Sequence, residues 1–244
     1  MRIIVCENYE EVSKKAAQMI LSQVTLKPNS VLGLATGSTP IGMYENLVSL
    51  NKKGDIDFSE VRTFNLDEYY KLPKDHYFMY KNLFDHININ PENIHIPNGM
   101  TDDVDAECER YDELIKEAGG VDIQVLGIGN NAHIGFNEPT INFEKGTHLV
   151  QLEDSTIEAN SRFFDNIEDV PKKAITMGVG SIFKSRKIML IATGENKAEA
   201  IYNTVYGKVV PEVPASILQF HSDIVLILDK EAAKLLKEED YKIA

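Results

Sequence analysis

The sequence has few of the features that would place it outside an ordinary water-soluble fold. Its 244 residues include only two cysteines, Cys6 and Cys108, too few for a disulfide framework or a cysteine metal cage. The longest purely aliphatic runs, such as residues 224–228, have the length of a β-strand, whereas a membrane-spanning helix needs about 20 apolar residues. The N-terminal segment MRIIVCENYE turns acidic too early for a signal peptide. We therefore expect a cytoplasmic protein without a membrane span.

Basic side chains are scarce relative to acidic ones. The chain carries 25 Lys and Arg against 38 Asp and Glu, which gives a formal net charge of −13. Such a surface repels nucleic acids and anionic lipids, because affinity for a phosphate backbone depends on clustered Lys and Arg. We expect neither as a partner. An anionic small molecule would have to be held by individually placed cations that act against the overall field.

Strand-like and helix-like segments alternate along the whole chain, and hydrophobic residues make up 43% of it. This alternation predicts a doubly wound, mostly parallel, Rossmann-like α/β sheet with helices on both faces. We see no linker and no internal repeat, so we expect one domain over residues 1–244, with a lid at about residues 150–172. Strands are predicted at residues 3–6, 31–34, 61–66, 94–96, 121–126, 174–177, 187–192 and 224–228, and helices at residues 8–23, 40–50, 77–87, 103–118, 195–206 and the C-terminus.

The first loop that places polar residues directly after a predicted strand is Thr36-Gly37-Ser38-Thr39, which follows the second strand. Ligands of such sheets bind beyond the carboxyl ends of the strands. A loop of glycine and hydroxyl residues at the start of a helix offers N–H groups and hydroxyls to an anion. Thr39 suits the N-cap and Pro40 the first helical position. The alternative is a well-capped turn without a ligand, and the ending of a Walker loop is absent.

Asp67 and Glu68 directly follow the third predicted strand. A carboxylate at this position that faces the anion loop, residues 36–39, is a candidate general base. The alternative is a solvated acidic turn, which is the commoner role of an Asp-Glu pair.

The fifth strand runs into GIGNNAHIGFNEP, residues 127–139, which presents His133 and Glu138 within one loop. An imidazole oriented by a carboxylate shuttles protons near neutral pH, although a lone histidine is more often structural. The glycine spacing also fits a dinucleotide fingerprint, with Glu153 near the place of its ribose-binding acid. That fingerprint must open a helix, and the segment after His133 lacks helical periodicity, so we reject it.

Two cations could oppose the acidic field at such a site. Lys197 falls in the first turn of a predicted helix, where a cation is unfavourable unless it meets an anion. Arg162 lies in the predicted lid. Each is an ordinary surface cation in the alternative interpretation. No pair of histidines has the spacing of a metal motif, and we expect no metal.

Taken together, these pieces resemble the glucosamine-6-phosphate deaminase family along nearly the whole chain. The motifs are GLATGSTPIGMY, FNLDEYY, LGIGNNAHIGFNEP, NSRFF, TMGVGSI and GENKAEAI. The resemblance implies an enzyme that converts glucosamine 6-phosphate to fructose 6-phosphate and ammonia without metal or organic cofactor. It further implies that residues 36–39, Arg162 and Lys197 hold the phosphate, that Asp67 is the enolising base, and that His133 opens the sugar ring with help from Glu138 and Asn131.

Two positions depart from the family pattern, in which Asp-Gly-His is common where this chain has Asn131-Ala132-His133. Asn131 can orient the imidazole by a hydrogen bond, but it holds no negative charge, so the relay would depend on Glu138. Ala132 restricts the turn if a positive φ is needed. The chain also ends earlier than the allosteric hexameric members it resembles, which favours a monomer or a small homo-oligomer.

Two other functions remain as alternatives. A 6-phosphogluconolactonase shares the architecture, the anion loop and a related histidine motif, but its pattern lacks the Asn-Glu-Pro ending and the Asp-Glu-Tyr setting found here. A sugar-phosphate-sensing domain of a transcriptional regulator would have a similar fold. The absence of a helix-turn-helix segment and the charge of −13 argue against that function.

Overall fold

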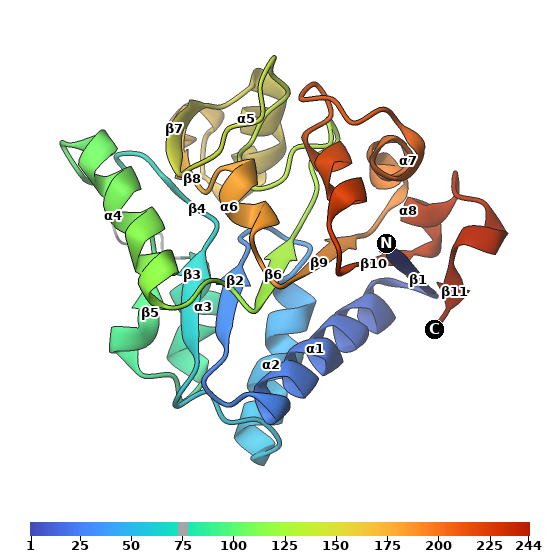
Figure 1. The fold of residues 1–244 in the computed structure, drawn as a ribbon, viewed down its shortest axis with the longest axis horizontal. Helices are drawn as coiled ribbons and strands as arrows, with labels where there is room; N and C mark the ends of the chain where they lie inside the picture. The colour runs from blue at the N-terminus through green and yellow to red at the C-terminus, as the bar shows by residue number, and fades with distance from the viewer. Residues whose placement is uncertain (73–77) are drawn as a thin grey trace.

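The computed structural model describes residues 1–72 and 78–244 and places most strands in one large parallel sheet (Figure 1). Eight strands lie in the order β11-β1-β10-β9-β6-β2-β3-β5, and every neighbouring pair is parallel. The predicted parallel α/β sheet is thus confirmed. The strands are β1 (Arg2–Cys6), β2 (Val31–Leu34), β3 (Arg62–Asn65), β5 (Ile94–His95), β6 (Ile123–Leu126), β9 (Lys187–Ala192), β10 (Ile224–Asp229) and β11 (Lys242–Ile243).

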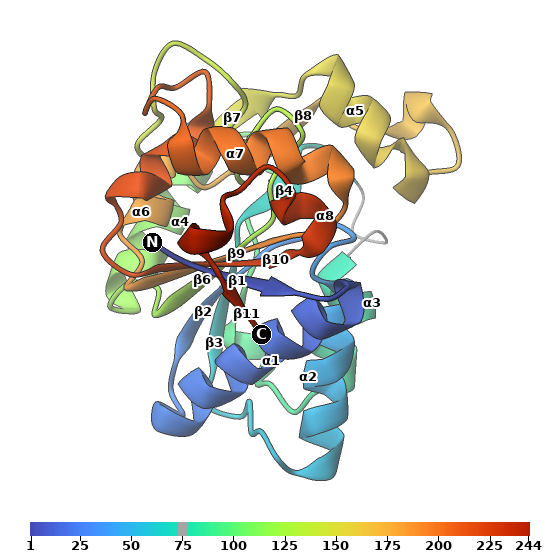
Figure 2. The ribbon, with the colours of Figure 1, turned by 90° about the vertical axis from the view of Figure 1, so that its right-hand side faces the viewer.

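Helices cover both faces of this sheet, as predicted. Figure 2 shows α1 and α2 on one side of the strands and α6 and α7 on the other. The first helix begins where the sequence predicts, because the side chain of Asn8 accepts the backbone N–H of Glu11 at 3.0 Å. The helices are α1 (Tyr9–Leu26), α2 (Ile41–Lys53), α3 (Phe78–Asn82), α4 (Val104–Glu117), α5 (Asp154–Asn160), α6 (Val179–Phe183), α7 (Ala198–Tyr206) and α8 (Lys230–Ala233).

The core lies around the central strands. All residues of β2, β6 and β10 are buried. Strands covered on both faces read as continuous apolar runs rather than alternating ones, which is why the sequence identifies them readily. Among the described residues, no helix has the length and apolar character needed to cross a membrane.

A second, three-stranded antiparallel sheet was not predicted. It has the order β4-β8-β7 and consists of β4 (Asp67–Tyr69), β8 (Lys173–Thr176) and β7 (His148–Gln151). The strand expected at residues 174–177 therefore belongs to this sheet and not to the large one. The other two strands are short and partly exposed, so neither produces the apolar run by which a buried strand is recognised.

Several helix boundaries differ from the prediction. The helix expected at residues 77–87 is α3 followed by a separate 3₁₀ turn, Phe84–His86, and Tyr77 lies outside the described residues. The C-terminal helix is only α8, after which the chain joins the edge of the large sheet as β11. In the helix expected at residues 195–206, the first three residues form a 3₁₀ turn, Glu195–Lys197, before α7.

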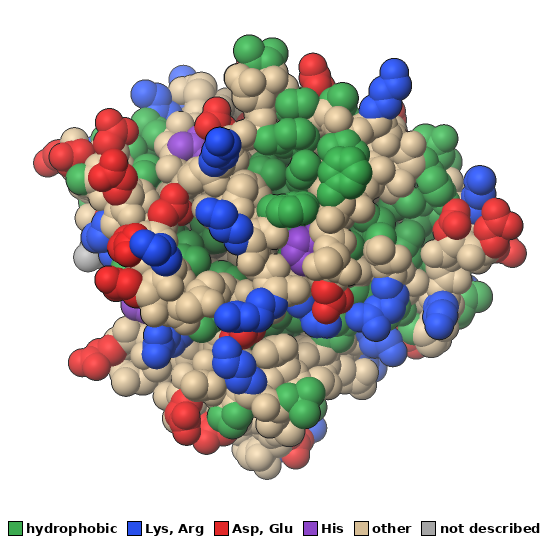
Figure 3. All heavy atoms as spheres, in the orientation of Figure 1, with side chains coloured by type: hydrophobic (Ala, Val, Ile, Leu, Met, Phe, Trp, Pro, Cys, Tyr) green, Lys and Arg blue, Asp and Glu red, His purple; other side chains and the backbone are tan. Residues whose placement is uncertain are grey.

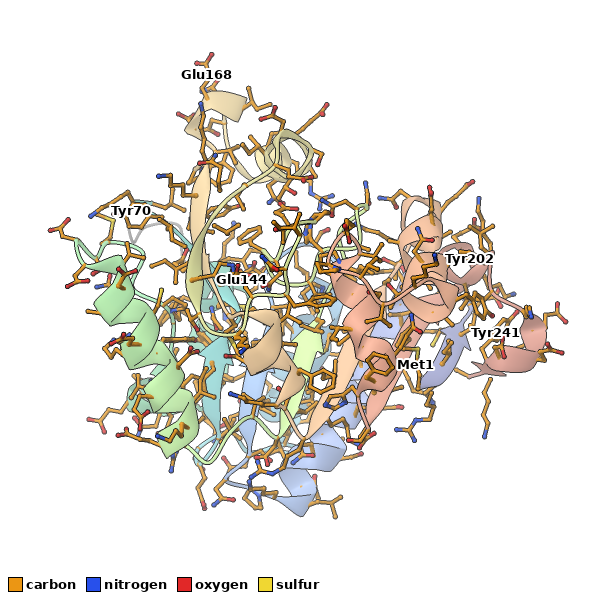
Figure 4. The ribbon with its side chains drawn as sticks, turned by 45° about the horizontal axis from the view of Figure 1, so that its top comes forward. Met1, Tyr70, Glu144, Glu168, Tyr202 and Tyr241 are labelled. Atoms are coloured by element: carbon orange, nitrogen blue, oxygen red, sulfur yellow. The ribbon has the colours of Figure 1, made fainter. Side chains whose placement is uncertain are left out.

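Residues 150–172 contain α5 and two 3₁₀ turns, and they cross the end of the sheet at which β2, β3 and β6 finish (Figure 1). Glu168, labelled in Figure 4, marks the outer end of this segment. On the face shown in Figure 3, acidic side chains gather over α4 and over the turn at residues 238–240. The segment at residues 150–172 is itself acidic, with exposed side chains at Glu153, Asp154, Glu158, Asp165, Glu168 and Asp169.

Candidate active site

The loops that follow β2 and β6 meet where the order of the large sheet reverses. From β2 the chain proceeds outward through β3 to β5, whereas from β6 it proceeds the other way through β9 to β10. Open parallel sheets bind ligands in the crevice at such a point. A cleft of about 950 Å³ lies there, and its lining includes every predicted site residue except Glu138: Thr36, Gly37, Ser38, Thr39, Asp67, Asn131, His133, Arg162 and Lys197.

The loop between β2 and α2 is open toward this cleft. Gly37 has a φ of +98°, in the left-handed region that favours glycine, and no atom lies within 4 Å of the position that a Cβ would occupy. The glycine is therefore required by the backbone conformation and not by close packing. The resulting loop exposes the hydroxyl groups of Thr36, Ser38 and Thr39 at the start of a helix of 13 residues.

The prediction that Thr39 caps α2 was wrong. The N-cap is Pro40, and no side chain of the cap accepts a hydrogen bond from the helix. The phenol of Tyr9, from α1, does this instead. Its oxygen accepts the N–H of Gly42 at 2.8 Å, and its hydroxyl lies 3.3 Å from the carbonyl oxygen of Ser38, to which it donates. Sequence reasoning missed Tyr9 because 29 residues separate it from Ser38.

The two predicted cations lie beside this loop. Arg162 reaches across from the 3₁₀ turn after α5, and its Nη2 donates to Oγ of Ser38 at 3.0 Å. Lys197 immediately precedes α7, and burial together with the charge of Arg162 lowers the pKa of its ammonium to about 8. Two cations held close together and partly desolvated are unfavourable alone, and an anion between them would relieve both costs.

Asp67 begins β4 and is almost fully buried, with 5% of its surface exposed. Burial and the neighbouring charge of Glu68 raise the pKa of its carboxyl to about 7, against a lowering effect of Thr36, whose Oγ1 lies 3.3 Å from Oδ1. Burial also raises the pKa of Glu68 to about 7, although its carboxylate accepts the N–H of Tyr69 at 2.8 Å. A carboxyl that titrates near neutral pH can accept a proton from carbon and return it.

The small antiparallel sheet brings Asp67 next to the loop at residues 127–139. In its register Asp67 pairs with Thr176, whose Oγ1 accepts the N–H of Phe136 at 3.1 Å. Gly135, in the loop at residues 127–139, lies close to both side chains and has a φ of +58°. A Cβ at Gly135 would stand 3.0 Å from Oγ1 of Thr176 and 3.7 Å from Oδ2 of Asp67. Glycine at this position therefore permits the close approach of the loop to the buried carboxyl.

His133 and Glu138 form the predicted pair. Nδ1 of the imidazole lies 3.2 Å from Oε2 of Glu138. Burial alone would raise the pKa of Glu138, but contact with His133 and hydrogen bonds from Thr156 and Asn131 lower it to about 2. Glu138 is therefore ionised at neutral pH and places a negative charge beside the imidazole.

The turn that presents this pair has a tight backbone. Ala132 adopts a positive φ of +65°, a left-handed conformation that is unfavourable for a residue with a side chain, so the restriction expected at this turn is present. A Cβ at Gly129 would overlap the ring of His133, so this glycine lets the imidazole lie against the main chain. Residues 127–139 contain no helix, which agrees with the rejection of the dinucleotide fingerprint.

Asn131 does not orient the imidazole directly, contrary to the prediction. Its Oδ1 accepts the backbone N–H of His133 at 3.2 Å. Its Nδ2 donates to Oε2 of Glu138 at 2.9 Å and to Oε2 of Glu153 at 3.1 Å. The side chain is thus oriented toward two carboxylates, and the second of them, Glu153, comes from the segment at residues 150–172.

No metal site is evident in residues 1–72 and 78–244, where no three His, Cys, Asp or Glu side chains are grouped as a metal ion would require.

Comparisons with known proteins agree with this geometry. Residues 7–226 match the family model described as glucosamine-6-phosphate isomerases/6-phosphogluconolactonase. The chain is 68% identical to a glucosamine-6-phosphate deaminase of Clostridium botulinum (strain Eklund 17B / Type B) and 60% identical to one of Clostridioides difficile (strain 630), in both cases over the full length of both chains.

Solved structures show the same relation. The chain superposes on a monomeric glucosamine-6-phosphate deaminase with a TM-score of 0.94 and 44% identity, over 96% of this chain and 100% of the other. It superposes on the 6-phosphogluconolactonase of Thermotoga maritima with a TM-score of 0.75 but only 18% identity, over 94% of this chain and 100% of the other, which shows a shared fold alone. The chain therefore belongs to the family of glucosamine-6-phosphate isomerases and 6-phosphogluconolactonases.

Proposed function

We propose that the protein is a glucosamine-6-phosphate deaminase, which converts glucosamine 6-phosphate and water to fructose 6-phosphate and ammonia. The observation that carries the proposal is the buried carboxyl of Asp67, which shares one cleft with an anion loop and with His133. An isomerase needs a base of this kind beside C2 of an amino sugar. The names of relatives at 60–68% identity support the same reaction.

The phosphate group would bind between residues 36–39, Arg162 and Lys197. A dianion at this position neutralises two cations that are held close together. It also raises the pKa of Lys197 and keeps its ammonium charged. Binding the phosphate fixes the sugar relative to Asp67 and His133, and well-oriented binding supplies several kcal/mol of a reaction barrier.

Ring opening would be the task of His133. The closed sugar must lose the proton of its anomeric hydroxyl and gain one at the ring oxygen, while the bond between C1 and the ring oxygen breaks. An imidazole can take the first proton and deliver the second. The ionised carboxylate of Glu138, 3.2 Å from Nδ1, stabilises the protonated ring between the two transfers.

Asp67 would then move a proton from C2 to C1. Its carboxylate removes the C2 proton while the substrate's own ammonium group gives a proton to the aldehyde oxygen, which forms an enolamine, and the carboxylic acid of Asp67 then returns the proton at C1. The product is an imine at C2. Water adds to this carbon, ammonia leaves it, and fructose 6-phosphate remains. A short carboxyl at a strand start, with a pKa of about 7, suits both halves of this transfer.

The segment at residues 150–172 is proposed as a lid, because it carries Arg162 to the anion loop. We also expect the protein to act as a monomer or small homo-oligomer, since one related deaminase is monomeric. Its cytoplasmic localisation stays a prediction.

Release of ammonia tests the proposal. Purified protein should release ammonia from glucosamine 6-phosphate with saturation, and should not open the lactone of 6-phosphogluconate at a comparable rate. Asp67→Asn, which retains the shape of the side chain, serves as the matched control and should abolish most of the release. Lactone hydrolysis without ammonia release would favour the lactonase instead, and binding of both sugar phosphates without turnover would favour a sensor.

A further inference from the structure

Glu153 has no role in the sequence pattern beyond a dinucleotide spacing that does not apply, yet the structure places it beside the catalytic loop, residues 127–139. It directly precedes α5. Its carboxylate accepts a hydrogen bond from Nδ2 of Asn131 at 3.1 Å, and its own N–H lies 3.4 Å from Oε1 of Glu138, to which it donates. Glu153 therefore contacts Glu138, one member of the pair formed with His133, and Asn131, which donates to Glu138.

The donors and acceptors in this cluster are fixed. Since Oδ1 of Asn131 accepts the backbone N–H of His133, its amide nitrogen must face the two carboxylates. An amide nitrogen carries two hydrogens, and here each has one carboxylate partner. The cluster thus consists of two carboxylates joined by one amide.

The same short segment reaches the phosphate side of the cleft. Glu153 and Thr156 contact Glu138 at the start of α5, and Arg162, just after the end of α5, donates to Ser38 in the anion loop. Residues 153–162 therefore span the distance between the groups proposed to open the ring and those proposed to hold the phosphate.

We propose that Glu153 is a positioning residue, which acts through Asn131 and Glu138 to hold His133 in place and attaches residues 153–162 to the catalytic loop. The proposal rests on the function proposed above. It also explains how this chain accommodates asparagine at position 131. A carboxylate there would stand beside Glu138 and Glu153 without the hydrogens that now join them, and like charges in contact would push α5 away from the loop.

Exchanging the amide at position 131 with the carboxylate at position 153 tests this proposal. Four proteins are compared: the natural chain, Asn131→Asp, Glu153→Gln and the double variant. The double variant moves the amide to the other side of the cluster and keeps two carboxylates. We expect Asn131→Asp to lower kcat/KM for glucosamine 6-phosphate by about tenfold, and addition of Glu153→Gln to recover most of that loss, because groups in one hydrogen-bond network are coupled. Glu158→Gln, an exposed change on α5, is the control and should match the natural chain.

Two further measurements separate positioning from general damage. Affinity for a reduced, open-chain amino-sugar phosphate should change little in all four proteins, because that ligand does not need its ring opened. Thermal midpoints should show that each variant folds. A double variant no more active than Asn131→Asp would overturn the proposal, as would equal loss of affinity for the open-chain ligand.

A titration of the His133 ring by NMR does not depend on turnover. Among the described residues, the carboxylates in contact with this cluster are Glu138 from the same loop and Glu153 from the start of α5, and Asp67 lies beside Gly135 of the loop. The added carboxylate of Asn131→Asp should raise the imidazole pKa, and the double variant should return it toward the natural value. If the natural chain releases no ammonia, the proposed function fails, while this titration still decides the inference. A pKa that stays where Asn131→Asp puts it would refute the coupling.

Discussion

Replacing Asp67 by asparagine should stabilise the protein while it removes activity. The side chain is buried, with 5% of its surface exposed, and its pKa rises from the ordinary 3.8 to about 7 because burial and Glu68 disfavour its charge. The folded state therefore carries an unfavourable anion above pH 7. Asparagine has nearly the same shape and no charge, so it does not incur this cost.

The pH dependence follows from linkage. Between about pH 4 and pH 7 the folded protein retains a proton on Asp67 that the unfolded chain has released, so stability contributed by this group falls as pH rises through that window. The difference between 3.8 and about 7 corresponds to about 4 kcal/mol at full effect. The new amide hydrogens lack assured partners, which costs about 1–3 kcal/mol. We expect a net gain of about 1–3 kcal/mol at pH 8, and about 2–4 °C in Tm per kcal/mol for a chain of this size.

Urea unfolding of the natural chain and Asp67→Asn at intervals from pH 4 to pH 8 measures the effect, and ammonia release measures activity. The stability difference between the two proteins should grow across the window and level off above pH 7, while kcat falls by about 100-fold or more. A difference that does not vary with pH, or a variant that is less stable than the natural chain at pH 8, would show that the anion of Asp67 is already well stabilised.

Three further predictions concern the other groups of the cleft. Arg162→Ala and Lys197→Ala should each raise KM for glucosamine 6-phosphate by a factor that corresponds to about 2–5 kcal/mol, and comparable activity of the natural chain on unphosphorylated glucosamine would contradict the phosphate assignment. His133→Gln should lower kcat/KM for the closed sugar far more than it lowers affinity for an open-chain analogue, with Glu138→Gln showing the same selectivity more weakly; equal loss of both would make the imidazole a contact residue. Gly129→Ala should displace the imidazole and reduce kcat while phosphate affinity persists, as measured by inhibition with inorganic phosphate, and unchanged kcat would show that the loop can adjust.

The sequence determined the large sheet and the position of the cleft. Buried parallel strands read as apolar runs, and their carboxyl ends must meet at one edge, so the sequence alone assigns the polar residues after each strand to one site. Residues 36–39, Asp67 and His133 line one cleft in the structure for this reason.

The tertiary structure decided what lies beside these residues. Asp67 acquires its raised pKa mainly by burial at the start of β4, in a small antiparallel sheet in which more than 70 residues separate β4 from the other two strands. Tyr9 replaces the predicted cap of α2 from another helix. Asn131 contacts Glu138 and Glu153 instead of the imidazole. Periodicity reports which face of an element is buried, but hydrogen bonds and desolvation between distant segments depend on distances that arise only when the chain has folded.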